Sequence, residues 1–174
     1  MLVHMKKEQK GFTLIELIVT IAIAGILIGV GIPSLRDMII NNRVTAYTND
    51  FVSALYLARS EAIKRGKRVA LCKSTDYASC AGGGGWEQGW VVFEDENNDG
   101  VFAPAEVIQI HEPLASGVTL TGIGTTAIYI SFLSDGSTQT LGGLPVAGQL
   151  TVTKSGKTRT INLSRIGRIQ VTKP

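Results

Sequence analysis

One carboxylate stands where a charge is costly. Glu16 is the only charged residue in the 21 residues of the segment 12–32. A charged side chain at the centre of a bilayer costs about 3 kcal/mol on insertion scales, so it needs a partner or a role. If the chain were cut between Gly11 and Phe12, the new amine would lie about one helical turn from Glu16. We therefore expect Glu16 of one chain to neutralise the Phe12 amine of a neighbouring chain during assembly.

A second group of polar residues matches a cation-binding template. In the segment DENNDGVFAPAE, the calcium-loop pattern D-x-[DN]-x-[DN]-G-x5-E places Asp95, Asn97, Asp99 and Glu106 at ligand positions. Alternating oxygen ligands and a distal glutamate suit a hard cation. The alternative is a polar turn between two strands, because strands rather than helices are expected on both sides. Calcium is the one cofactor that the sequence suggests.

The two cysteines, Cys72 and Cys80, fit neither a CxxC redox motif nor a paired zinc-ligand pattern. In an oxidising compartment they would close a small disulfide loop that stabilises the fold by about 2–3 kcal/mol. The alternative is a pair of unrelated small residues. The two histidines, His4 and His111, are isolated, and no nucleophile elbow, metal trio or phosphate loop is visible. The sequence therefore predicts a protein that is not an enzyme.

Charge is unevenly distributed along a chain whose formal net charge is +3. There is no Lys or Arg between positions 74 and 153, and no Asp or Glu between positions 136 and 174. The basic C-terminal segment supplies candidate phosphate contacts to DNA, which would be sequence-independent and salt-sensitive. The alternative is a solvated basic sheet edge that discourages aggregation. The candidate DNA contacts are Lys157, Arg159, Arg165, Arg168 and Lys173.

A second basic group indicates an assembly contact or an anionic partner. Its members are Lys64, Arg65, Lys67, Arg68 and Lys73.

The elements that position these residues begin with the apolar segment. At ~1.5 Å per residue, a helix over residues 12–32 reaches ~31 Å, the thickness of a bilayer core. Lys6, Lys7 and Lys10 precede it, which predicts a cytoplasmic N-terminus and a body on the other side of the membrane. A secretory signal would have a shorter apolar core followed by a cleavage site. A plain membrane anchor would leave Glu16 unexplained.

Beyond Pro33, apolar residues recur every three to four positions up to Gly66, which predicts that the helix continues as an amphipathic half, with Pro33 kinking or locally opening it. From position 67 the period changes to that of short strands separated by turns such as SDGS, GGLP and KSGK. The pattern predicts an α+β protein in which a meander-like, mostly antiparallel sheet is covered on one face by the helix.

The segment KGFTLIEL resembles the class III signal of type IV pilins and of type II secretion pseudopilins. The resemblance implies cleavage after Gly11 by a prepilin peptidase and N-methylation of Phe12. Glu16 and Pro33 match the glutamate and the proline of that family. The implied leader is 1–11, and Met5 is an alternative start that would shorten it.

The segments ALYLARSEAIKRGKRVALC and GWVVFEDENNDG, with a C-terminal Gly-Arg, resemble the FimT, FimU and GspH branch of minor pilins. Some FimT-type pilins take up DNA through a Gly-Arg-x-Arg element; here Gly167 and Arg168 match, whereas Gln170 replaces the second arginine. The resemblance implies a pilin fold with a removed leader (1–11), a transmembrane assembly helix (12–32), its amphipathic half (33–66) and a β-rich periplasmic head (67–174).

The function that this resemblance implies is a minor pilin or pseudopilin of a type IV pilus or a type II secretion pseudopilus, held in the bacterial inner membrane until assembly. The expected partners are other pilins, the prepilin peptidase, the inner-membrane assembly platform and the membrane itself. Two alternatives remain open at this point. One is a DNA receptor displayed on a pilus, and the other is a membrane-tethered enzyme, for which the sequence offers no catalytic set.

Overall fold

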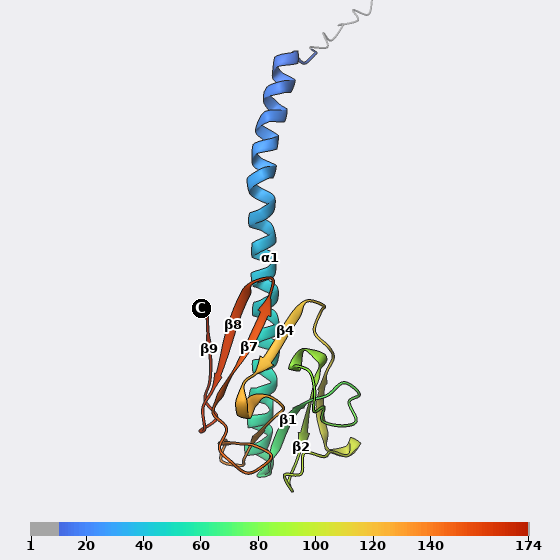
Figure 1. Ribbon diagram of the computed structural model, residues 1–174, viewed down its shortest axis with the longest axis vertical. Coiled ribbons are helices and arrows are strands. Elements are labelled where there is room, and N and C mark those ends of the chain that lie inside the picture. The colour runs from blue at the N-terminus through green and yellow to red at the C-terminus, as the bar shows by residue number, and fades with distance from the viewer. Residues whose placement is uncertain (1–10, 174) are drawn as a thin grey trace, which may run out of the picture. The chain divides into compact units, whose positions relative to one another are not determined.

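A computed structural model of the protein describes residues 11–173 (Figure 1). Its first element is a single helix, α1 (Leu14–Arg65), which is not interrupted at Pro33. The chain divides into two compact units, Met1–Ile39 and Ile40–Pro174. All described residues that are buried lie in the second unit, which we call the head. The predicted helix is confirmed, and it begins two residues later than the apolar run.

Within the head, α1 buries one stripe whose members recur every three to four residues, as an amphipathic helix requires. The buried members are Val44, Thr48, Phe51, Ala54, Leu55, Ala58 and Ala62. Thr48 was not expected in this stripe. It is tolerated because its hydroxyl donates to the Val44 carbonyl oxygen at 2.6 Å, so no polar group is left unsatisfied. Phe51 lies at the centre, with its ring 5.1 Å from those of Trp86 and Trp90.

The strands form two antiparallel sheets instead of the single meander that the sequence suggested. One sheet has the order β3–β2–β1–β5–β6 and the other the order β4–β7–β8–β9. The strands of the first are β1 (Val69–Lys73), β2 (Trp90–Glu94), β3 (Val107–His111), β5 (Tyr129–Phe132) and β6 (Thr138–Gln139). Those of the second are β4 (Val118–Gly122), β7 (Gly148–Lys154), β8 (Lys157–Leu163) and β9 (Ile169–Thr172). Short 3-10 turns are η1 (Trp86–Gln88), η2 (Pro104–Glu106) and η3 (Gly124–Thr126).

The two sheets arise because β4 pairs with neither of the strands that precede and follow it in the chain, β3 and β5. β4 pairs with β7, whereas β5 returns to β1. Both sheets contribute to one apolar core with α1, in which Leu71 of β1 and Ile161 of β8 are fully buried. A smaller apolar cluster covers the other face of the five-stranded sheet and includes Cys72, Phe93 and Phe102. β1 is therefore buried on both faces.

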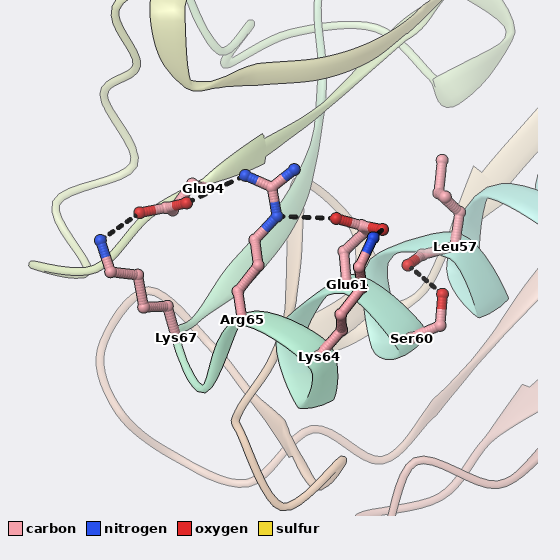
Figure 2. A network of polar contacts seen from close by, with 7 residues as sticks. All are labelled: Leu57, Ser60, Glu61, Lys64, Arg65, Lys67 and Glu94. Carbon is pink, nitrogen blue, oxygen red and sulfur yellow. Dashed lines mark hydrogen bonds and ion pairs between the residues drawn. The ribbon is translucent and has the colours of Figure 1, made fainter.

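An ion-pair network joins the last turn of α1 to the end of β2 (Figure 2). Arg65 contacts Glu61 at 2.7 Å and Glu94 at 3.2 Å. Lys67 contacts Glu94 at 2.7 Å and Glu96 at 3.1 Å. Hydrogen bonds from Lys67, and secondarily from Arg65, hold the pKa of Glu94 below its ordinary value. The network closes the turn between α1 and β1 against the neighbouring strand.

This network changes the interpretation of the second basic group, residues 64–73. Lys64 lies 3.5 Å from Glu61, and Arg65 and Lys67 belong to the network described above. Arg68 donates to the Ser131 hydroxyl and Lys73 to the Gly84 carbonyl oxygen. All five cations therefore have partners within the chain, so the group is better explained by internal pairing than by an anionic partner.

The C-terminal Gly-Arg motif sits in the turn between β8 and β9, where its glycine has a structural role. Gly167 has a φ of 73°, and a Cβ there would overlap the carbonyl oxygen of Gly136. Arg59 of α1 completes the junction, because its guanidinium donates to the carbonyl oxygens of Gly136 (3.2 Å) and Ile166 (3.4 Å). One arginine thus ties two sheet turns to the helix.

We expect Gly167→Ala to lower the melting temperature of the detergent-solubilised protein by well over 5 °C, because the added Cβ meets both backbone strain and a carbonyl oxygen. Gly156→Ala is the matched control. Gly156 has a similar φ of 79° but nothing within 4 Å of an added Cβ. Its loss should be limited to the strain term, about 1–2 kcal/mol. Equal losses in the two variants would contradict the close contact with Gly136.

We expect Glu94→Gln to lower the melting temperature by a few degrees at neutral pH and low salt, and by less at high salt, where exposed ion pairs are screened. Because the folded-state pKa of Glu94 is depressed, its stabilisation is present above its ordinary value of 4.5 and is lost as pH falls below it. The difference between variant and wild type should therefore shrink in acid. Glu96→Gln is the control and should have a smaller effect, because the Glu96 side chain is 70% exposed.

Candidate functional site

The first unit presents an apolar helix surface that no other described part of the chain covers. Phe12 is 83% exposed, and Ile26 and Val30 are 68% and 72% exposed. Among the described residues, α1 is the one helix that is long and apolar enough to cross a membrane, and the qualifying window lies near the N-terminus. An apolar surface of this size on a soluble monomer would be exceptional. It marks a segment that is covered by lipid or by other protein.

Glu16 has a local partner at the start of this segment. Thr13 precedes α1, and its hydroxyl accepts a hydrogen bond from the Glu16 backbone N–H at 3.3 Å. In return, the Glu16 carboxylate accepts from the Thr13 backbone N–H at 3.2 Å and from its hydroxyl at 3.1 Å. This reciprocal arrangement is a capping box, which satisfies two donors that a helix start leaves unpaired. Glu16, the third residue of α1, therefore helps to cap the start of the helix.

The capping role of Glu16 is missing from the sequence predictions, although its signal is present in the chain. The letters TLIE are the pattern [ST]-x-x-[DE] before an apolar run, which is the signature of a capping box. The capping role does not remove the cost of the charge. Hydrogen bonds from a threonine supply no positive charge to the carboxylate.

The expected cleavage site lies at the edge of the described residues. Residues 1–10, which include His4, Met5 and most of the expected leader, are outside them. Gly11 and Phe12 are both exposed and precede the helix. The Gly11–Phe12 peptide bond is therefore accessible and non-helical.

The predicted disulfide is confirmed. Cys72 of β1 bonds Cys80, with a Cα–Cα distance of 5.5 Å. Inside the loop that it closes, Asp76 accepts hydrogen bonds from the backbone N–H groups of Ala78 and Ser79, both at 3.0 Å. These bonds, led by that from Ala78, lower the pKa of Asp76 to about 2. The loop is thus held by a covalent bond and by a carboxylate that stays ionised in mild acid.

The loop that matches the calcium template is filled by internal hydrogen bonds. Asp95 is buried, and its carboxylate accepts from the backbone N–H groups of Asp99 and Gly100 and from the Tyr129 hydroxyl at 2.7 Å. Burial, together with this bond, raises the pKa of Tyr129. The Glu106 carboxylate turns back to the Ala103 N–H at 2.7 Å.

The side chain of Asn97 donates to the Asp99 carboxylate at 2.7 Å, which adds to this internal bonding. Within residues 11–173, no group of three or more His, Cys, Asp or Glu side chains is placed to hold a metal ion. The arrangement agrees with the polar turn that was the alternative to calcium.

The five candidate DNA contacts are divided between two ends of the four-stranded sheet. Arg165 and Arg168 are exposed in the turn between β8 and β9. Lys157 begins β8, Arg159 follows it on the same face, and Lys173 follows the last residue of β9. Seven residues of β8 separate the groups by ~20 Å. The sequence placed these cations in one segment, but the fold does not bring them together.

His111 packs against a buried tryptophan. Its ring stacks on that of Trp90 with centroids 3.8 Å apart, and its Nδ1 lies 2.7 Å from the Glu112 carbonyl oxygen. The neighbouring hollow between α1 and β3 is lined by Asp50, Ser53, Ala54, Leu57, Gln109 and His111. His111 therefore serves as a cover for Trp90.

Comparison with known proteins identifies two sequence families. Residues 47–167 match the family model of type II transport protein GspH, and residues 6–32 match that of the prokaryotic N-terminal methylation motif. Two fimbrial proteins of Pseudomonas aeruginosa are each 45% identical to the chain over 74 residues. This match covers 41% of the chain and 47% of those proteins, so the chain spans about half the length of the curated relatives it matches.

Solved structures share the fold. The type IV minor pilin FimU of Pseudomonas aeruginosa is 20% identical with a TM-score of 0.57, over 75% of this chain and 89% of FimU. The minor pseudopilin EpsH from the type 2 secretion system of Vibrio cholerae is 15% identical with a TM-score of 0.52, over 76% of this chain and 98% of EpsH. One long N-terminal helix packed on antiparallel sheets is common to them, which confirms the predicted pilin fold.

We expect the double variant Cys72→Ala, Cys80→Ala to lose about 2–3 kcal/mol of stability, because the open loop restores entropy to the unfolded chain. Thermal unfolding with and without a reductant checks this. The reductant should destabilise the wild-type protein and leave the double variant unchanged. A wild-type protein that is insensitive to complete reduction would contradict a stabilising role for the disulfide.

Proposed function

The chain belongs to the GspH family of type II transport proteins, and from this premise we propose that it is a minor pilin or pseudopilin without enzymatic activity. Its function would be to enter a type IV pilus or a type II secretion pseudopilus through its N-terminal helix. The observation that carries this proposal is the uncovered apolar half of α1, which begins with a single acidic residue. A surface of that kind needs lipid before assembly and neighbouring helices after it.

Processing would convert the start of the helix into an assembly contact. Cleavage of the accessible Gly11–Phe12 bond by a prepilin peptidase would leave Phe12 with a free amine, which the same enzyme class would methylate. The match of residues 6–32 to the methylation motif supports this step. Phe12 adjoins Thr13, whose backbone N–H already bonds Glu16. The new positive charge would therefore lie beside the carboxylate, or beside that of an adjacent subunit.

The charge pair would set the register of helices in the filament. Apolar burial is non-directional and would stabilise many alignments of two such helices. A carboxylate that is buried without a cation is costly, so alignments that pair Glu16 with a Phe12 amine would be selected. Glu16 would thus act first as a helix cap and then as the subunit-to-subunit contact. Pro33 would be part of the same assembly segment.

The environment of the head supports export from the cytoplasm. The Cys72–Cys80 disulfide is of a kind that persists in oxidising compartments. Lysines before the apolar segment favour a cytoplasmic N-terminus. We place the protein in the bacterial inner membrane as a single-pass subunit with a periplasmic head, from which an assembly platform would extract it. Deletion of the gene for this chain would distinguish the two machines. A loss of pili would indicate a type IV pilus, and a loss of secreted proteins would indicate a type II secretion pseudopilus.

Two substitutions at position 16 separate capping from charge. Glutamine is accepted at this position of a capping box, so Glu16→Gln keeps the helix start and removes the charge. Glu16→Ala removes both. If assembly requires the charge, both variants should insert in the membrane normally and both should be at least about tenfold depleted from sheared filaments or from the pseudopilus, since breaking a buried pair is costly.

Thr13→Ala is the matched control, because it removes the hydroxyl of the cap and keeps the carboxylate. It should be incorporated far better than Glu16→Gln. Normal incorporation of Glu16→Gln would show that Glu16 acts by capping alone. Mass spectrometry of the wild-type product supplies a second test: a chain that starts at methylated Phe12 is expected, and a chain that retains the basic leader would refute processing.

A further inference from the structure

The two sheets of the head end in four edge strands, and three of these edges are covered or flanked by charges. At the edge of β4, the Leu120 backbone N–H donates to the Glu87 carboxylate at 2.9 Å. The short strand β6 is bridged by Pro145. The edge strand β9 is flanked by Arg168 and Lys173. The fourth edge strand, β3, pairs with β2 on one side and with no strand of residues 11–173 on the other.

The free side of β3 exposes backbone groups that can pair with another strand. The His111 carbonyl oxygen faces β2, because a Cβ built on Gly89, the residue before its partner Trp90, would lie 2.8 Å from it. Backbone groups of successive residues in a strand point to alternate sides, so the N–H and C=O of Ile110 point to the free side. β3 has the sequence VIQIH, without the lysine or proline that commonly protects an edge.

An apolar hollow lies beside β3 on the face of the sheet that is turned away from α1. Val107 identifies the face, because it is opposite Phe93 of the smaller apolar cluster. The hollow has a volume of about 290 Å³, and Ile110 in its lining is 47% exposed. We call it the outer hollow, and it is lined by Tyr77, Ala78, Phe102, Pro104, Val107 and Ile110. Tyr77 alone among these brings a polar side-chain atom, so the outer hollow suits an apolar side chain.

The hollow on the other face of β3 suits a cation. It is the hollow between α1 and β3 that is described above, with a volume of about 310 Å³. Asp50 is its one charged lining residue; it is exposed and belongs to none of the ion pairs of residues 11–173. Exposed Glu106 and Glu112 flank β3, and no Lys or Arg lies between positions 74 and 153. The electrostatic environment of this edge therefore favours a basic partner.

We propose that the free edge of β3 binds an extended segment of a different pilin or pseudopilin subunit, in which basic side chains alternate with apolar ones. A strand added to β3 sends successive side chains to opposite faces, so one enters the outer hollow and the next approaches Asp50. Backbone hydrogen bonds supply affinity and the two hollows supply specificity. The inference rests on the proposed function, because that function identifies the donor as another filament subunit.

Charge and packing argue against a second copy of this chain as the donor. Pairing two β3 strands would bring Asp50, Glu106 and Glu112 of one copy close to the same residues of the other, and like charges across a strand pair are destabilising. The basic edge strand β9 has one face occupied already, because Ile169 is buried in the core of its own head. A separate extended segment has both faces available.

The experiment measures the binding of a labelled peptide of alternating lysine and valine to the detergent-solubilised full chain, by fluorescence anisotropy in a non-ionic detergent. The matched control is the same peptide N-methylated at every peptide bond, which keeps charge and side chains but cannot donate to a strand edge. We expect the control to bind at least about tenfold more weakly, since each backbone hydrogen bond contributes about 1 kcal/mol. Equal binding of the two peptides would overturn the proposal.

Two acidic positions test the charged side of the site. Asp50→Asn should weaken binding of the unmodified peptide about two- to fivefold, as expected for an exposed ion pair. Asp135→Asn removes the same charge from the turn between β5 and β6, at the opposite edge of the sheet, and should leave binding unchanged. An equal loss in both variants would reduce the effect to net charge and overturn the assignment of Asp50.

Two apolar positions test the strand edge. Ile110→Lys places a like charge in the path of the peptide and should weaken binding at least about tenfold, because it also removes an apolar contact. Ile128→Lys is the control, since Ile128 is 44% exposed and lies outside β3. Thermal unfolding verifies that each variant is folded, and Asp50→Asn tests the edge independently of any change in the strand.

Two further outcomes identify other occupants and separate this inference from the proposed function. Dimers of the chain alone that Ile110→Lys dissociates, together with no binding of the peptide, would assign the edge to a second copy and overturn the proposal. Because the binding assay contains no filament, a failure to bind the peptide contradicts this inference alone. A wild-type chain that is absent from pili and from the pseudopilus would instead contradict the proposed function.

Discussion

Assembly of this protein turns on one carboxylate, that of Glu16, at the start of an apolar helix surface that no other described residue covers. Glu16 is satisfied locally, because it and Thr13 exchange hydrogen bonds across the first turn of α1. Those bonds start the helix but carry no positive charge. The first turn of the helix is therefore capped, but its hydrogen bonds give the Glu16 carboxylate no positively charged partner. Such a chain fits a subunit whose Glu16 gains a positively charged partner during assembly. Family membership, the accessible bond before Phe12 and the apolar surface beyond it all agree with this.

In the head, short strands of both sheets pack on one helix around a shared apolar core. Phe51 packs against Trp86 and Trp90, and both sheets contribute to the core around it. Arg59 then bonds the turns that contain Gly136 and Ile166, so the last strands are fixed to the helix by backbone oxygens. The second half of α1 and both sheets are thus held together as one compact head.

The distribution of charge in space differs from its distribution along the chain. Residues 64–73 look like a cationic patch in the sequence, but carboxylates such as Glu61 and Glu94 neutralise much of it, and backbone or hydroxyl oxygens hold the remainder. The basic C-terminal segment is split by its strands into two groups, one at each end of a sheet. The group at Lys157 and Lys173 lines a hollow beside the first turns of α1 in the head.

The long helix, the strand-rich head, the disulfide pair and the acidic start of the apolar segment could all be predicted from the residues alone. These features follow from local periodicity, composition and short spacing, and the capping box could have been predicted from the letters TLIE. Three features became visible in the folded chain and not before: the strands form two sheets, Gly167 lies against the Gly136 carbonyl, and Asp95 accepts a hydrogen bond from Tyr129. Strand partners are separated by long stretches of chain, and their pairing depends on which apolar faces can be buried together. That requirement is set by the whole core, so no local pattern in the sequence encodes it.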